Sequence, residues 1–231
     1  MKHKITSLTV RISDHLGDVE ALLLRPDDAG CLCVLAHGAG AGMRHPFMEG
    51  LACELAASHV ATFRYQFPYM QKKRGRPESP AVLTETVRAA VRAASAAAPG
   101  LPLLAGGKSL GGRMTSLAFS EQAADKMGGR HVRGLVFVGF PLHQPGHPSA
   151  ERASHLQRVP VPMLFLQGTR DSLADLSLLR PVCNKLGHRA TLHVVDGADH
   201  SFHMLKRSGR TDGDVLSELA RTVASWAESL S

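Results

Sequence analysis

Leu103-Leu-Ala-Gly-Gly-Lys-Ser-Leu-Gly-Gly-Arg113 is the stretch that decides the fold of this chain. Its first residues have the composition of a short apolar strand, which runs into Gly107-Lys-Ser-Leu-Gly111 and then into a helix. This is a G-x-S-x-G pattern at a sharp strand-to-helix turn, which lifts a serine hydroxyl clear of a sheet. We expect Ser109 to have a strained backbone, with the two glycines allowing close packing and the helix N-terminus stabilising negative charge. The stretch predicts a nucleophilic serine.

The same letters also end a phosphate-binding loop, because Gly107-Lys-Ser109 closes a Walker A motif. That motif needs a glycine five positions before Gly107, where this chain has Pro102. It also needs a loop in the segment that Leu101–Ala105 fills with strand-forming apolar residues. The nucleotide-binding interpretation is therefore excluded.

Apolar runs alternate with helical patterns along the rest of the chain. The predicted strands are Ile5–Ile12, Val19–Leu24, Cys31–Ala36, Val60–Phe67, Leu101–Ala105, Val132–Phe140, Val161–Gln167 and Ala190–Val195. The predicted helices are Pro46–Ser58, Pro80–Ala98, Leu110–Lys126, Leu173–Leu186 and Val215–Leu230, with a short helical piece over Ala150–Gln157. The first two strands alternate apolar and polar residues, as an antiparallel pair at a sheet edge does. The pattern predicts an α/β fold, with a mostly parallel twisted sheet and helices on both faces.

Length and composition suit a single domain over residues 1–231, since 231 residues with 44% hydrophobic content can bury a substantial core. No apolar run reaches the roughly 18 residues that span a bilayer, and the N-terminus lacks the apolar core of a signal peptide. We therefore expect a cytoplasmic protein with no membrane partner. The four cysteines match neither a disulfide framework nor a zinc pattern, so we expect buried reduced thiols. They are Cys31, Cys33, Cys53 and Cys183.

Basic residues exceed acidic ones, which gives a formal net charge of +7. Part of the excess lies in Lys72-Lys-Arg-Gly-Arg76, which is too short and too poor in aromatic residues to predict nucleic-acid binding. Two interpretations of this run stay open, a solvated loop and a surface that attracts anionic substrates.

A serine hydroxyl becomes a nucleophile when a base removes its proton and a third group orients the base. Asp171 follows an apolar strand in Gly-Thr-Arg-Asp, and His200 lies in the loop after the next strand. Because the carboxyl ends of parallel strands share one edge of a sheet, we expect both side chains to converge on Ser109.

Each partner has a competitor in the sequence. Asp171 can instead cap the following helix, with Asp175 as the acid, although the place of Asp171 directly after the strand favours it. His193 lies within a predicted strand, and His203 lies one helical turn beyond His200 and can line the same cleft. A metal bound by His200 and His203 with Asp196 or Asp199 lacks a site signature, so we expect neither a metal nor a cofactor.

A tetrahedral intermediate needs two backbone donors for its negative charge. The N–H of Leu110, directly after the nucleophile, is the first candidate. The second lies in the glycine-rich loop after the strand that ends at Ala36, with Ala39 favoured and Gly40 next. This loop does not fit the dinucleotide pattern G-x-G-x-x-G, because position 43 is Met. The loop therefore predicts an oxyanion hole.

With these residues in place, the chain resembles an α/β-hydrolase over nearly its whole length. Three strings are similar to the small, lid-poor group related to dienelactone hydrolases, namely Leu35-Ala-His-Gly-Ala-Gly-Ala-Gly-Met-Arg-His-Pro-Phe-Met48, Arg64-Tyr-Gln-Phe-Pro-Tyr69 and Gly107-Lys-Ser-Leu-Gly-Gly-Arg113. Within that group they resemble a branch similar to domains of eukaryotic chromatin-associated proteins, some of which are not enzymes. Dienelactone hydrolase itself has a cysteine nucleophile where this chain has Ser109, so its lactone specificity does not carry over.

The predicted function is hydrolysis of an ester or thioester of a small soluble substrate, anionic or neutral, through an acyl-enzyme. Only 20 residues separate Phe140 from Val161, too few for a large helical cap, so we expect an open cleft. Peptidase and C–C hydrolase activities use the same parts and stay open, as do a monomer and a homodimer. The alternative is a non-catalytic binding or scaffold protein with this fold. We predict substrate contacts for His37, Met43, Tyr69, Lys72, Arg74, Lys108 and His203.

Overall fold

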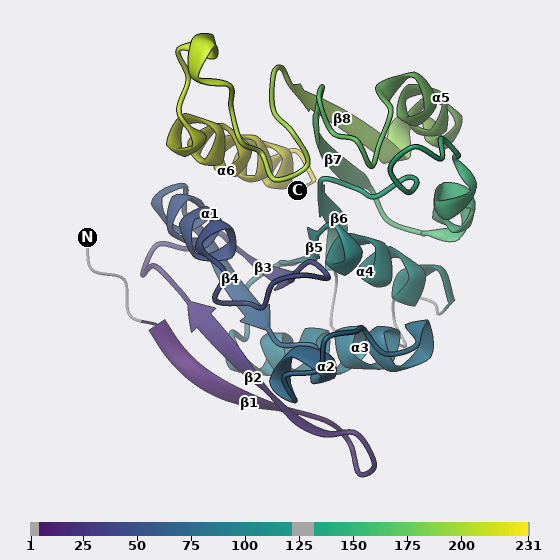
Figure 1. Ribbon diagram of the computed structural model, residues 1–231. Helices are drawn as coiled ribbons and strands as arrows, with labels where there is room; N and C mark the ends of the chain where they lie inside the picture. The colour runs from purple at the N-terminus through teal and green to yellow at the C-terminus, as the bar shows by residue number, and fades with distance from the viewer. Residues whose placement is uncertain (1–4, 122–131, 231) are drawn as a thin grey trace.

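The computed structural model describes residues 5–121 and 132–230. Its eight strands form one twisted sheet in the order β1-β2-β4-β3-β5-β6-β7-β8 (Figure 1). The strands are β1 (Ile5–Ser13), β2 (Gly17–Leu24), β3 (Cys31–Ala36), β4 (Val60–Tyr65), β5 (Leu103–Lys108), β6 (Val132–Val138), β7 (Met163–Gly168) and β8 (Ala190–Val195). β1 pairs antiparallel with β2, and β2 pairs antiparallel with β4. The other pairs are parallel, as the sequence predicts.

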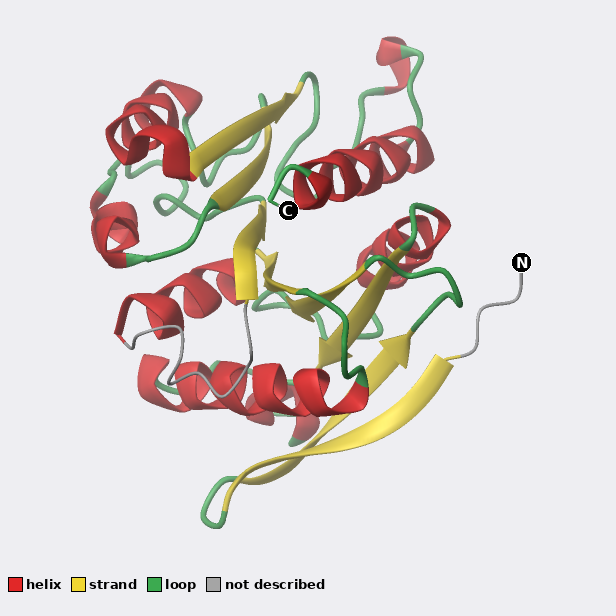
Figure 2. Cartoon of the chain, turned by 180° about the vertical axis from the view of Figure 1, so that it is seen from behind, coloured by secondary structure: helices red, strands yellow, loops and turns green. Residues whose placement is uncertain are grey.

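Helices cover both faces of the sheet, as Figure 1 and the view from behind in Figure 2 show. The main helices are α1 (Pro46–Ala57), α3 (Pro80–Ala97), α4 (Leu110–Glu121), α5 (Leu176–Leu186) and α6 (Asp212–Glu228). Helices α1 and α6 pack on one face, and α3, α4 and α5 pack on the other.

The two hydrophobic cores follow from the two-residue period of the strands. In β6, Leu135 and Phe137 belong to the core beneath α3, α4 and α5, whereas Val136 and Val138 belong to the core beneath α1 and α6. A central parallel strand buries both faces in this way, which is why its sequence is a continuous apolar run. The α/β fold class is confirmed.

Several boundaries differ from the predictions. Strand β5 continues through two glycines to Lys108, because pairing with β3 and β6 on both sides overrides the low strand propensity of glycine. Helix α6 begins at Asp212, one turn earlier than predicted, because Thr211 and Asp214 form a capping box. The segment between the predicted strand Val60–Phe67 and the predicted helix Pro80–Ala98, for which no element is predicted, contains the short helix α2 (Pro68–Gln71). The predicted end of α4 at Lys126 lies outside the described residues.

The connection between β6 and β7 carries no helical cap in the described residues. Its only helical element there is the 3₁₀ helix η2 (Glu151–Arg158). The prediction of four buried thiols is wrong for Cys53, which is exposed on α1, whereas Cys31, Cys33 and Cys183 are buried. Within the described ranges, no helix combines the length and apolar character needed to cross a membrane.

Candidate active site

The turn between β5 and α4 holds Ser109 in the left-handed region, with φ of 51°. Such a conformation costs a residue other than glycine roughly 1–3 kcal/mol, so the surrounding structure must impose it. The flanking glycines permit this, because an added Cβ would lie 2.2 Å from the Ala36 carbonyl oxygen at Gly107 and 2.5 Å from it at Gly111. The predicted close packing is present, and the neighbour that requires it is the end of β3.

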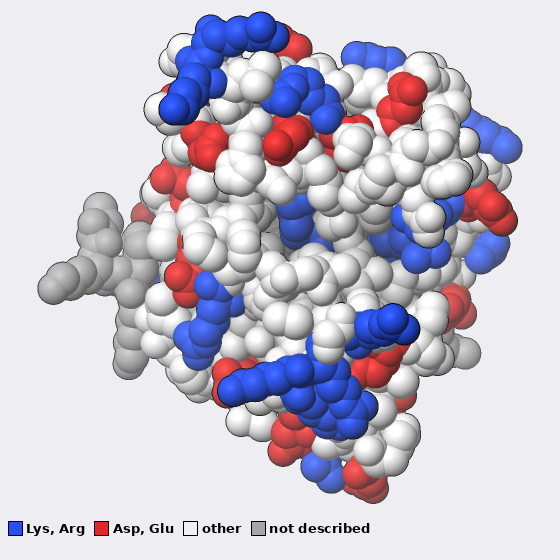
Figure 3. Space-filling view, viewed as in Figure 1, with Lys and Arg blue, Asp and Glu red and all other residues white. Residues whose placement is uncertain are grey.

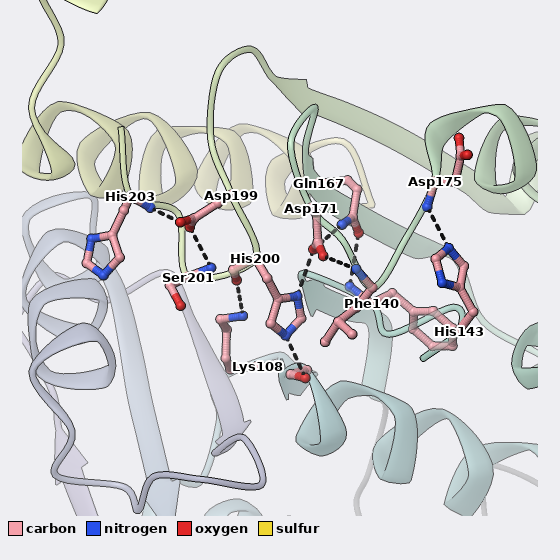
Figure 4. Close-up of polar contacts among 12 residues, drawn as sticks. Lys108, Phe140, His143, Gln167, Asp171, Asp175, Asp199, His200, Ser201 and His203 are labelled. Atoms are coloured by element: carbon pink, nitrogen blue, oxygen red, sulfur yellow. Dashed lines mark hydrogen bonds and ion pairs between the residues drawn. The ribbon is translucent and has the colours of Figure 1, made fainter. Parts of the chain in front are cut away.

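His200 lies between Ser109 and Asp171. Figure 4 shows its imidazole pointing to the Asp171 carboxylate. Its Nε2 is 2.9 Å from Ser109 Oγ, and its Nδ1 is 2.7 Å from Asp171 Oδ2. The three side chains come from the turn after β5, the loop after β7 and the loop after β8. The carboxylate is buried, whereas the imidazole side chain keeps 23% exposure. Residues 91 positions apart in the sequence therefore meet at the carboxyl edge of the sheet, where the sequence places them.

Gln167, which the sequence analysis missed, helps to orient Asp171. Its Nε2 donates to Asp171 Oδ2 at 2.5 Å, and its Oε1 accepts the Phe140 N–H at 3.1 Å. The Leu173 N–H donates to the other carboxylate oxygen at 2.8 Å. Both oxygens of Asp171 therefore have donors. A polar residue near the end of the apolar run of β7 was the available sequence signal for Gln167.

The alternatives to this trio lie elsewhere. Asp175 caps α5, with Oδ1 accepting the Ser177 N–H at 2.8 Å. His193 lies on the edge strand β8 and pairs with Glu218 at 2.7 Å. His203 pairs with Asp212 at 2.5 Å, and this carboxylate raises the pKa of His203. Across the described part of the chain, no three His, Cys, Asp or Glu side chains gather as a metal site would require.

The loop of residues 38–40 is held from below by buried side chains. The Tyr69 hydroxyl lies 3.2 Å from the Gly38 carbonyl oxygen and 3.0 Å from that of Ala39. His37 Nδ1 donates to the Gly38 carbonyl at 2.8 Å, and its Nε2 accepts the Phe67 N–H at 3.0 Å. Burial lowers the pKa of His37 to about 4, so this histidine is neutral near pH 7. The loop therefore has a fixed backbone.

The next turn is fixed in the same manner. Arg64 Nη1 donates to the Met43 carbonyl at 2.9 Å, and Gln66 Oε1 accepts the Met43 N–H at 2.9 Å. Arg64 is 1% exposed and Met43 is fully buried. Residues 37–43 thus form a rigid segment whose supporting side chains come mainly from β4 and the start of α2.

A cavity of about 620 Å³ opens beside Ser109 and is bordered by the first turns of α1 and α6. Figure 3 shows a hollow in the centre of this face. Its apolar wall consists of Pro46, Phe47, Met48, Leu173, Phe202 and Leu216. Of the residues with a predicted role, Ser109, His200, Ala39, Gly40, Lys108 and His203 line it.

Other predicted substrate contacts do not reach this cavity. His37, Met43 and Tyr69 are at most 1% exposed and support the 37–43 segment, so predicting them as substrate contacts was wrong. Lys72 and Arg74 are exposed but outside the cavity wall. They follow α2, where Lys and Arg side chains gather below the hollow in Figure 3.

The family model for the alpha/beta hydrolase domain matches residues 29–228. The matched segment runs from just before β3 to the end of α6. It therefore contains the 37–43 segment, Ser109, Asp171 and His200.

Solved structures with the same fold include dienelactone hydrolase from Anabaena variabilis, at 18% identity and a TM-score of 0.73, covering 98% of this chain and 97% of that chain. A serine hydrolase without a lid from Xanthomonas campestris has 19% identity and a TM-score of 0.70, covering 98% of this chain and 96% of that chain. The esterase domain of a Rhodothermus marinus protein has 16% identity and a TM-score of 0.70, covering 97% and 98% of the two chains. At these identities the likeness establishes the fold.

Proposed function

The chain belongs to the alpha/beta hydrolase family, and from this premise we propose that it is a serine hydrolase that cleaves an ester or thioester of a small substrate. The observation that carries the proposal is the hydrogen-bonded series from Ser109 Oγ through the imidazole of His200 to the Asp171 carboxylate. A serine, a base and a buried orienting acid in this geometry are the parts that nucleophilic acyl transfer requires.

In the proposed reaction, His200 Nε2 takes the proton of Ser109 as Oγ attacks the carbonyl carbon. The tetrahedral intermediate collapses, and His200 gives this proton to the departing alkoxide or thiolate. A water molecule then attacks the acyl-serine, His200 takes a water proton, and the proton returns to Ser109 Oγ as the acid departs. Asp171 accepts the Nδ1–H of His200 throughout and stabilises the imidazolium.

The oxyanion donors that we propose are the N–H groups of Leu110 and Ala39, with Gly40 as the next candidate. Leu110 begins α4, so its N–H has no partner within the helix. In a trans peptide the C=O and the following N–H point in opposite directions. Because the Gly38 and Ala39 carbonyls point at the buried Tyr69 hydroxyl, the N–H groups of Ala39 and Gly40 point away from it. This orientation supports the assignment.

The cavity wall favours a substrate with one apolar group. The wall residues near Ser109 are mainly aromatic and aliphatic, and such a wall gains free energy when it contacts apolar surface. The anionic preference predicted from Lys72–Arg76 remains a proposal about long-range attraction, since these side chains do not line the cavity.

Labelling with a fluorophosphonate probe tests the proposed function directly, because the probe reacts with an activated serine. We expect wild type to be labelled, and Ser109→Ala and His200→Ala to remain unlabelled. The chain supplies a matched control in Ser116, whose Oγ lies 2.7 Å from His155 Nε2 although both side chains are buried. Ser116→Ala should therefore label like wild type.

The same experiment weighs the scaffold alternative. Labelling that survives in Ser109→Ala would contradict the assignment of the nucleophile. Absence of labelling in folded wild type, together with no cleavage of activated esters, would favour a non-catalytic binding protein.

A further inference from the structure

Lys108, directly before the nucleophile, reaches across to the loop that carries His200. Its Nζ donates a hydrogen bond to the backbone carbonyl of His200, a residue 92 positions later in the sequence (Figure 4). Because Lys108 ends β5 and His200 follows β8, this bond connects the turn that carries Ser109 to the loop that carries His200. The sequence predicts a substrate contact for Lys108, but the structure commits its ammonium to the protein backbone.

The ammonium lies close to the side chains of His200 and Asp171. A Cβ built on Gly139 would lie 3.1 Å from Lys108 Nζ and 3.5 Å from both Asp171 Oδ2 and His200 Cε1. Gly139 has a φ of 68°, and the three functional groups surround the place where a side chain would be. The ammonium, the carboxylate and the imidazole are therefore close neighbours.

Two aromatic rings also lie near the ammonium. Nζ lies 5.5 Å from the ring centroid of Phe202 and 5.8 Å from that of Phe47, so two aromatic rings provide favourable faces for a cation. Burial lowers the pKa of Lys108 to about 8, while Asp171 and Asp199 act in the opposite direction. Lys108 is thus still charged in the range around pH 6.5, where histidines ordinarily titrate.

Charged and titratable groups approach this space from each neighbouring element. Asp171 comes from the loop after β7, and Asp199 and His200 come from the loop after β8. His45 before α1, His203 in the loop after β8 and Asp212 at the start of α6 also line this cavity. Among the described residues that line the cavity, Lys108 is the only lysine or arginine.

We propose that Lys108 is a positioning residue for His200, whose hydrogen bond fixes the histidine loop and whose positive charge opposes protonation of the imidazole. Since the base must be neutral to accept the serine proton, this charge extends the active range of the site toward lower pH. The kinetic consequence rests on the proposed function, whereas the effect on the imidazole does not.

The decisive experiment titrates His200 by NMR in a Ser109→Ala background, where no turnover is needed. The chain has 13 histidines, so the His200 signal is assigned by its loss in His200→Gln. We compare Lys108→Met, which removes charge and donor, with Lys108→Gln, which keeps a donor without charge. Removal of the charge should raise the His200 pKa by roughly 0.5–1 unit in both variants. Lys72→Met, at an exposed site outside the cavity, is the control and should leave it unchanged.

Kinetics of the Lys108 variants with Ser109 intact separate the effect of the positive charge from the effect of the hydrogen bond to the histidine loop. The acidic limb of the kcat/KM profile should move up in pH by the same roughly 0.5–1 unit in both variants. At the pH optimum, kcat should fall about tenfold in Lys108→Met and less in Lys108→Gln, which retains a bond to the loop. A His200 pKa unchanged in folded Lys108→Met would overturn the proposal, even if kcat falls, because a purely structural lysine predicts that result. An inactive wild type with the expected titration shift would instead count against the hydrolase function alone.

Discussion

Two regions meet at Ser109, and they are built in different ways. On one side, Asp171 and His200 take part through their own side chains, which contact one another directly. On the other side, residues 38–40 carry the backbone N–H groups that we propose as donors, and the carbonyls of this loop are held by the side chains of Tyr69 and His37. The acid–histidine side therefore depends on the side chains of Asp171 and His200 themselves. The 37–43 segment depends on its backbone, which buried side chains hold in place.

The difference determines how each region responds to substitution. A change on the acid–histidine side removes or misorients a group that takes part in the proposed chemistry. A change among the supports of the 37–43 segment leaves every proposed donor in the protein and alters only how firmly it is held. We therefore expect large losses on the first side and graded losses on the second.

Asp171→Asn should have the largest effect. The amide keeps the size of the carboxylate, but it no longer stabilises the imidazolium and it permits the wrong tautomer of His200. We expect kcat for an activated ester to fall roughly 10³- to 10⁴-fold with little change in KM. Asp175→Asn, which alters the cap of α5, serves as the control and should stay near wild type in kcat. A loss of less than about tenfold in Asp171→Asn would remove the distinction between the two sides.

The buried histidine that supports the 37–43 segment, His37, should make the stability of the protein depend on pH. The folded pKa of His37, about 4, lies below the ordinary value of 6.5, so the unfolded chain binds a proton more readily. This contribution is present above pH 6.5 and is lost as the pH falls toward 4, by about 1.5 kcal/mol between pH 6.5 and 5. His155 has the same shift from burial and adds an equal dependence.

Urea unfolding at several pH values measures this dependence. In His37→Gln the fall in unfolding free energy between pH 6.5 and 5 should be about 1.5 kcal/mol smaller than in wild type, and His155→Gln should behave likewise. The double variant should have little pH dependence from this source. An unaltered slope in all three variants would mean that neither histidine is held neutral by the fold.

Tyr69→Phe tests the support of residues 38–40 with a smaller change. Loss of a whole oxyanion donor typically costs 10²- to 10³-fold in kcat. Removal of the hydroxyl only loosens the loop, so we expect about a tenfold loss in kcat with KM nearly unchanged. The chain's other tyrosine, Tyr65, is equally buried and lies on β4 rather than on α2, so Tyr65→Phe is the matched control. Equal losses in the two variants would assign the effect to general destabilisation.

The same contrast explains what the sequence could reveal. The periodicity of the strands and helices predicted the fold, because each central strand must be apolar on both faces. Ser109, Asp171 and His200 were placed correctly at one sheet edge, because a parallel sheet brings its loops there; their catalytic roles stay predictions.

The supports were harder to predict. Tyr69 and His37 look like substrate contacts, since a polar aromatic side chain near a glycine-rich loop gives no sign of which side it approaches. Both side chains are buried because of how β4 and α2 pack in the folded protein, which the sequence alone does not reveal. Gln167 was missed because its role depends on Asp171 and Phe140, which tertiary structure brings together.

The smallest effect should come from the basic run after α2, which belongs to neither side. Lys72 and Arg74 are exposed and do not line the cavity, so they can act only through their long-range field. For an ester with a carboxylate, kcat/KM of wild type should fall about two- to fivefold between low and high salt, because exposed charges are screened beyond roughly 10 Å at 0.1 M salt. A neutral ester of similar size should show no such fall.

The variant with Lys72→Glu and Arg74→Glu should lose the salt dependence while keeping its activity on the neutral ester. If the anionic ester is insensitive to salt in wild type, the run is a solvated loop, and substrate selection depends on the cavity alone.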